Sequence, residues 1–195
     1  MPVRSPFRAV PRGAVRYYGA GEEAVAWQPG DFILTHGDAW TSRLIRFGQR
    51  LRIRGRDAVF AYWNHAAMVV SAKGDLVEAL GGGVSRTNAS KYRGTDYHVI
   101  DTAAITVDRD EAVAFASWCA DEQAPYGFVT LVSIAWTLLT GAKFSFFVDG
   151  SEICSGLVAR CQERTGAIFN RDPVHIMPAD LAKYFEVEPP IKGGP

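Results

Sequence analysis

The sequence contains little cysteine and has no excess of either charge. Three cysteines among 195 residues, without CxxC spacing, do not predict a disulfide framework or a zinc site. Basic and acidic residues number 21 each, so there is no global reason to expect nucleic acid or an anionic membrane as a partner. Reduced thiols are the simpler interpretation, and they predict a cytoplasmic protein.

Long apolar runs are also missing. The longest, Phe128 to Leu139, is interrupted by three hydroxyl-bearing residues and is too short to span a bilayer, so no membrane span is expected. Residues 1–15 are basic but contain three prolines and no apolar core, which does not predict a secretory signal. With 48% hydrophobic and 22% charged residues, the chain suits one globular domain with a sizeable core.

The pattern along the chain predicts a mixture of strands and helices. Proline and glycine punctuate residues 1–28, which predicts an irregular arm before a single domain over 29–187 and a tail over 188–195. Two β-rich runs around Lys73-Gly74-Asp75 predict a hairpin. Strands are expected over 32–35, 61–71, 76–80, 84–86 and 97–100, and helices over about 38–50, 108–124, 127–140, 152–165 and 178–185. For the second of these helices, Asp108 to Glu111 predict a capping box.

One cysteine lies where a helix would activate its thiol. Gly150 and Ser151 supply a break and a capping side chain, and the apolar residues that follow recur at helical spacing. Cys154 then falls in the first turn, where the helix dipole and unpaired N–H groups favour the nucleophilic thiolate. Cys119 and Cys161 lie further along helices and lack this advantage. A lone buried cysteine is more often a small hydrophobe, and this is the simpler interpretation of Cys154 taken alone.

A nucleophilic cysteine needs a base, and four histidines are candidates: His36, His65, His98 and His175. His65 begins the central and most apolar strand of the predicted hairpin. Glu78 lies on the partner strand, where the two side chains could be diagonal neighbours on one face. A buried carboxylate needs a partner, so the joint pattern predicts a cysteine, a histidine and an orienting acid. Taken singly, His65 could be a core histidine and Glu78 a solvent-facing edge charge.

Six arginines occur within fourteen residues, at positions 43, 46, 50, 52, 54 and 56. Such a run is typical of a solvated surface. It could also form an anion site that faces a substrate phosphate or carboxylate, since guanidinium groups bind both in a forked geometry. On that second interpretation, Arg46 and Arg50 are the expected substrate-binding residues.

Several short blocks resemble the NlpC-type papain-like cysteine peptidases. The blocks are Pro29-Gly-Asp-Phe-Ile-Leu34, Asn64-His-Ala-Ala-Met-Val-Val70, Leu76-Val-Glu-Ala79, Tyr126-Gly127 and Glu152-Ile-Cys-Ser-Gly-Leu-Val158. The cysteine block comes last, an order similar to the circularly permuted branch that includes the YiiX-like proteins and, more distantly, lecithin–retinol acyltransferase relatives. The resemblance covers residues 29 to 185 and implies an α+β, papain-like fold with a small antiparallel sheet packed against a helical layer.

The resemblance also implies a site and a reaction. Cys154 would be the nucleophile, His65 the base and Glu78 the orienting group, with Tyr126 near the substrate. The expected activity is that of a cysteine hydrolase, amidase or acyltransferase that cleaves an amide or ester through a Cys154 thioester, without metal or organic cofactor. The substrate could be lipid-like, or it could be a peptide or cell-wall amide. A non-catalytic binding module of the same fold is the third possibility.

Overall fold

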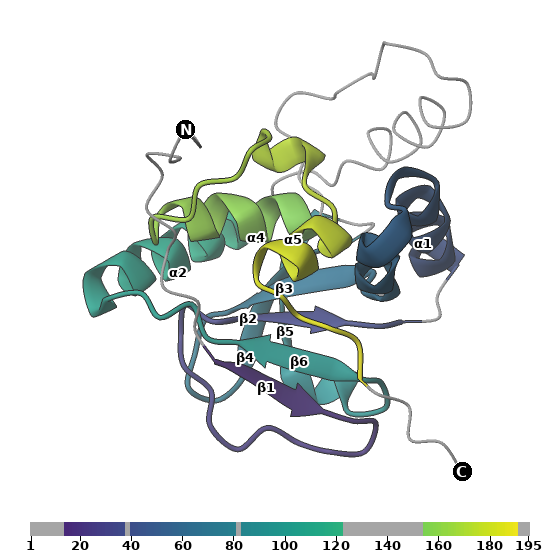
Figure 1. The fold of residues 1–195 in the computed structure, drawn as a ribbon. Coiled ribbons are helices and arrows are strands. Elements are labelled where there is room, and N and C mark those ends of the chain that lie inside the picture. The colour runs from purple at the N-terminus through teal and green to yellow at the C-terminus, as the bar shows by residue number, and fades with distance from the viewer. Residues whose placement is uncertain (1–13, 38–39, 81–82, 123–153, 191–195) are drawn as a thin grey trace.

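A single antiparallel sheet organises the chain (Figure 1). The computed structural model describes residues 14–37, 40–80, 83–122 and 154–190. The sheet has six strands in the order β1-β6-β2-β3-β4-β5. Their bounds are β1 Val15–Tyr18, β2 Phe32–Thr35, β3 His65–Val69, β4 Asp75–Leu80, β5 Gly83–Asn88 and β6 Tyr97–Ile100. The predicted helix over 127–140 and Tyr126 lie outside the described residues.

Helices gather on one side of this sheet, where α2, α4 and α5 lie in Figure 1. The α-helices are α1 Trp40–Arg52, α2 Thr106–Asp121, α4 Cys154–Glu163 and α5 Pro178–Tyr184. Short 3-10 turns are η1 Gly55–Tyr62, η2 Ala89–Tyr92 and η3 Pro173–His175. The predicted α+β class, with a small antiparallel sheet against a helical layer, is therefore confirmed. None of the helices in the described ranges has the length and apolar character needed to cross a membrane.

Both faces of the sheet are buried, which explains why the central strands are almost continuously apolar. On the helical side, strand residues such as Ala66, Met68 and Val77 share a core with Leu157 and Val158 of α4. The other face has its own cluster, whose buried members are Ala24, Ile33, Ala67, Val69, Leu76, Ala89, Tyr97 and Val99. Trp27, Tyr18 and Tyr92 pack against that second cluster from loops, an edge strand and η2.

Three predictions about local structure are wrong. The strand expected over 61–71 is shorter, because η1 extends to Tyr62 and β3 covers His65–Val69. Val15–Tyr18, expected within an irregular arm, forms edge strand β1 along β6, with Tyr17 opposite His98. A four-residue edge strand is held by backbone pairing to one neighbour. Its sequence therefore shows little of the apolar periodicity that would predict a strand. Helix α2 begins at Thr106 with Ile105 as its N-cap, so Asp108 lies in the first turn instead of capping the helix.

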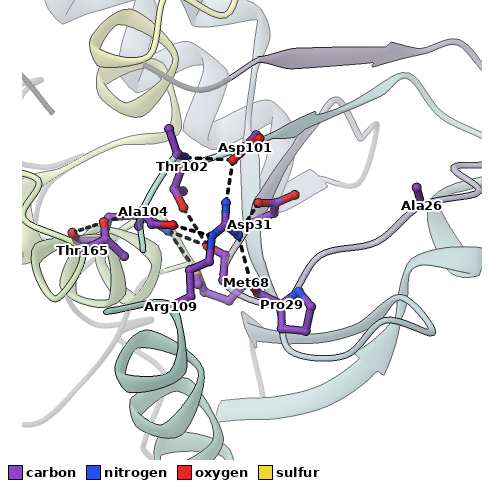
Figure 2. A network of polar contacts seen from close by, with 12 residues as sticks. Ala26, Pro29, Asp31, Met68, Asp101, Thr102, Ala104, Arg109 and Thr165 are labelled. Atoms are coloured by element: carbon purple, nitrogen blue, oxygen red, sulfur yellow. Dashed lines mark hydrogen bonds and ion pairs between the residues drawn. The ribbon is translucent and has the colours of Figure 1, made fainter. Parts of the chain in front are cut away.

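The start of α2 is set by its buried Arg109, which lies between strand ends (Figure 2). Its guanidinium donates to Asp31 Oδ1 at 2.8 Å, to the Pro29 carbonyl at 3.0 Å and to Asp101 Oδ1 at 2.5 Å. Arg16 of β1 donates to the second oxygen of Asp31 at 2.9 Å. This network joins β1, β2, β6 and α2 at one end of the sheet, so long-range pairing outweighs the local capping signal.

The network requires glycine at position 30. Gly30 has φ +92, and a Cβ there would lie 2.9 Å from Arg109 Cβ. Its carbonyl also accepts from Gln162 Nε2 of α4 at 3.3 Å and from Thr102 Oγ1 at 3.5 Å. The absence of a side chain therefore lets Arg109 of α2 approach the start of β2 closely.

We predict that Gly30→Ala destabilises the protein more than Gly21→Ala does. Gly21 has a similar φ of +94 but nothing within 4 Å of the added Cβ, so its substitution measures backbone strain alone, about 1–2 kcal/mol. Gly30→Ala adds a clash with Arg109, which costs roughly a further 1–3 kcal/mol. Urea unfolding of the two variants measures the difference. Equal free energies of unfolding would show that Arg109 moves aside freely.

Candidate active site

Cys154 is the first residue of α4, and its side chain is buried at 3% exposure. The sulfur accepts hydrogen bonds from two backbone N–H groups, those of Ala66 and Ser155. Ser155 is held in turn by its hydroxyl, which donates to the Ile176 carbonyl at 2.6 Å. A thiol at a helix start, facing N–H donors, is in an environment that favours the thiolate.

The Ala66 N–H is available because the sheet opens between β3 and β4. Strand β3 pairs with β2 over four residue pairs, but its register with β4 covers two, Met68↔Val77 and Val69↔Leu76. The Val70 N–H donates to Asp75 of β4, whereas the Val69 N–H donates to Asp31 beside β2. By alternation, the Ala66 N–H points to the β4 side. At the start of β3 this donor meets the Cys154 sulfur instead of a β4 carbonyl.

His65 lies at this opening and contacts Glu78 directly. Its Nε2 is 2.6 Å from Glu78 Oε2, and the Glu78 side chain is fully buried. The imidazole also hydrogen-bonds the Cys154 sulfur. Because Nε2 faces the carboxylate, Nδ1 is the ring nitrogen left for the sulfur. The predicted contact between His65 and Glu78 is confirmed, and the structure brings all three expected residues together.

The chain leading into β3 is fixed by buried polar contacts. Gln49 of α1 donates to the Trp63 carbonyl at 2.8 Å and accepts from the Ala179 N–H of α5 at 2.9 Å. Asn64 exchanges two hydrogen bonds with the Gly37 backbone, at 2.8 and 2.9 Å. These contacts hold the residues just before His65, so the backbone that carries the imidazole is fixed in position.

The charges of the three groups support one another. Burial alone would lower the pKa of His65, but the Cys154 thiolate and Glu78 outweigh burial and raise this pKa to about 9. Burial opposes the charged form of Cys154 as well, yet His65 and the two N–H donors bring the thiol pKa below its ordinary value. Burial also opposes ionisation of Glu78, but His65, Lys91 and Thr87 lower its pKa to about 2. All three shifts therefore favour the charged forms, which are a thiolate, an imidazolium and a carboxylate.

The other histidines are engaged elsewhere. The His36 ring stacks on Tyr62 with centroids 4.0 Å apart, and its Nδ1 donates to the Tyr62 carbonyl at 2.7 Å. His98 is buried against Trp63, with ring centroids 4.5 Å apart. His175 is exposed in η3. Of the four candidate bases, His65 is the one that the structure places on the Cys154 sulfur.

The arginine-rich segment divides between structural and exposed members. Arg46 is half-buried on α1, with Nη1 2.7 Å from His36 Nε2. Arg52 forms a two-pronged contact with Asp180 of α5, both distances 2.9 Å. Arg50 is exposed, as are the remaining arginines, which are Arg43, Arg54 and Arg56. Of the expected substrate-binding residues, Arg50 faces solvent, Arg46 contacts His36, and Tyr126 is not among the described residues.

Three residues that the sequence analysis missed surround Glu78. Thr87 of β5 and Lys91 of η2 donate to Oε1, while the Tyr92 hydroxyl donates to Oε2. The Tyr92 ring is also 5.9 Å from the His65 ring, centroid to centroid. The available signal was indirect: a buried glutamate needs several donors, and a polar stretch runs from the end of β5 into η2.

Within the described ranges, histidine, cysteine and acidic side chains form no cluster of three or more that could hold a metal ion. Comparison with protein-family models finds no match to the chain, and comparison with curated proteins finds none either.

We predict that iodoacetamide modifies Cys154 before Cys119 or Cys161, with a pH midpoint below the ordinary thiol value of about 8.5. The reason is that the Cys154 thiolate is stabilised at a helix start by His65 and two N–H donors, whereas Cys119 and Cys161 lie further along their helices. His65→Ala should move the midpoint upward, because burial then acts without an imidazolium. Peptide mass spectrometry after timed labelling gives each rate. Faster labelling of Cys161, or an unchanged midpoint in His65→Ala, would remove the basis for the assignment.

Proposed function

We propose that the protein is a thiol hydrolase or acyltransferase that cleaves an amide or ester through a thioester on Cys154. One observation carries the proposal: the His65 imidazole bridges a buried thiol at a helix start and a fully buried carboxylate. A nucleophile, a base and a group that orients the base are the parts that covalent acyl transfer needs.

The first half-reaction transfers the acyl group to sulfur. The Cys154 thiolate attacks the carbonyl carbon, a C–S bond forms, and the carbonyl electron pair moves to oxygen. When that pair returns, the C–N or C–O bond breaks, and the leaving group takes its proton from the His65 imidazolium. The products are a Cys154 thioester, a neutral imidazole and a free amine or alcohol.

The second half-reaction releases the acyl group. Neutral His65 removes a proton from water, and the oxygen attacks the thioester carbonyl. The C–S bond then breaks, so that a carboxylic acid leaves and the thiolate–imidazolium pair is restored. An alcohol or amine in place of water gives acyl transfer by the same steps. Glu78 stays ionised throughout and keeps the imidazole oriented, as its lowered pKa allows.

The start of α4 also suits the negative oxygen of the tetrahedral intermediate. Backbone N–H groups at a helix N-terminus lack partners within the helix, and the dipole favours an anion there. We assign the Cys154 N–H as the oxyanion donor. The chain order, in which the sheet precedes the cysteine helix, agrees with that of the permuted papain-like peptidases. Membership of that superfamily is part of this proposal.

The exposed side of α1 favours an amphipathic substrate. Arg43, Phe47 and Arg50 are all exposed and recur at helical spacing, which combines cationic and apolar groups on one face. Helix α1 packs on η1, which leads directly into His65. We therefore propose an acylated amide or ester with an anionic head, in preference to a cell-wall peptide.

We predict that fatty-acyl amides or esters with an anionic head are hydrolysed faster than cell-wall peptides, and that Cys154→Ala abolishes both reactions. Arg50→Ala should raise KM about two- to fivefold, the range for an exposed charge contact. Arg46→Ala tests the second expected contact, although it also removes the bond to His36.

Arg171→Ala is the matched control, because Arg171 is an exposed arginine outside the 43–56 segment. Steady-state kinetics on both substrate classes measure the outcome. Faster hydrolysis of cell-wall peptides, with the same KM in Arg50→Ala as in the unmodified protein, would indicate that the substrate is a peptide. Binding of either class without any turnover would indicate a binding module.

A further inference from the structure

Four donors converge on the buried Glu78 carboxylate, two on each oxygen. His65 Nε2 at 2.6 Å and the Tyr92 hydroxyl share Oε2. The Thr87 hydroxyl and the Lys91 ammonium share Oε1. The carboxylate is therefore bonded to two groups that can carry positive charge, His65 on one oxygen and Lys91 on the other.

We propose that Lys91 is a positioning residue that shares the Glu78 carboxylate with His65. By competing for this carboxylate, Lys91 sets the pH above which His65 loses its proton and the ion pair between Cys154 and His65 is lost. This inference rests on the proposed function, because it concerns the same imidazole. It assigns a role to a residue outside the set of Cys154, His65 and Glu78.

The proposed effect of Lys91 is electrostatic. Among the described residues, the groups that face Glu78 or the His65 ring are His65 from β3, Thr87 from β5, Lys91 and Tyr92 from η2, and Cys154 from α4. The Tyr92 phenol stays protonated, because burial and the nearby carboxylate raise its pKa. The charged forms that these groups can take are then two anions, Glu78 and the Cys154 thiolate, and two cations, His65 and Lys91. The Lys91 charge opposes protonation of His65, both directly and through the shared carboxylate.

Lys91 is held in place by the turn that carries it. Asn88 caps η2 by accepting from the Ser90 N–H at 3.0 Å, and the Ala89 N–H donates to the Gly74 carbonyl at 2.9 Å. Asn88 Nδ2 also donates to Asp75 Oδ1 at 3.1 Å. Strand β5 thus ends beside the start of β4, and η2 folds back so that Lys91 reaches Glu78. The turn therefore holds the Lys91 ammonium at a fixed position beside the Glu78 carboxylate.

Lys91 also connects the site with solvent. Its side chain is 39% exposed, whereas that of Glu78 is 0% exposed. Its ammonium lies 5.0 Å from the centre of the Tyr92 ring, which adds a cation–π contact. Partial exposure screens the charge, so its effect on His65 should be moderate instead of the several units seen for fully buried pairs.

The test is an NMR titration of the His65 ring carbon in the full-length protein, which needs no substrate. We expect a midpoint near 9 in the unmodified protein. Lys91→Met should raise the His65 midpoint by about half a unit to one unit, because Glu78 then stabilises the imidazolium without a competing cation. Lys91→Gln keeps a donor without the charge and should give the same rise in the His65 midpoint. This second variant provides the test if the methionine variant folds poorly.

Two matched variants separate charge from structure. Lys91→Arg keeps the charge and should leave the midpoint unchanged. Thr87→Val removes a neutral donor from the same oxygen and should move the midpoint less than Lys91→Gln does. An unchanged midpoint in Lys91→Gln, or an equal shift in Thr87→Val, would overturn the inference. Failure to acylate Cys154 would instead overturn the proposed function and leave the titration result standing.

Discussion

The hydrogen-bonded contact between His65 and Glu78 is the interaction on which the site depends. A carboxylate removed from water is costly unless it is paired, and Glu78 is stabilised by four donors. Its retained charge favours the imidazolium form of His65, and the imidazolium favours the Cys154 thiolate. Each charge is therefore stabilised by the next one, and neutralising Glu78 would remove support from the whole series.

Strand β2 connects the Arg109 network with the candidate site. Asp31, just before the strand, is bound by Arg109 and Arg16, whereas Thr35 at the other end pairs with His65. The ion-pair network thus fixes one end of the central strands, and the polar contacts around Trp63 fix the approach to the other. The reactive groups lie where β3 and β4 separate, which gives the thiol a backbone donor without breaking the rest of the sheet.

Local patterns predicted the parts of the site that are close in sequence. The hairpin turn at Gly74 fixes β3 against β4, so the diagonal relation of His65 and Glu78 could be counted along the strands. The cysteine at a helix start followed from the apolar spacing after it. The donors Thr87, Lys91 and Tyr92 were missed because their role depends on η2 folding back over the sheet. Helix α2 was misplaced for a similar reason, since its start is set by a partner 78 residues away, Asp31.

Intact-mass analysis during reaction with an activated acyl ester shows whether Cys154 carries the acyl group. We expect a single adduct of acyl mass on Cys154 that forms rapidly near neutral pH and disappears as ester is consumed. His65→Ala should slow its formation by roughly 10²-fold or more. An adduct on Cys161 or Cys119, or none on Cys154 while the ester is still hydrolysed, would show that Cys154 is not the nucleophile.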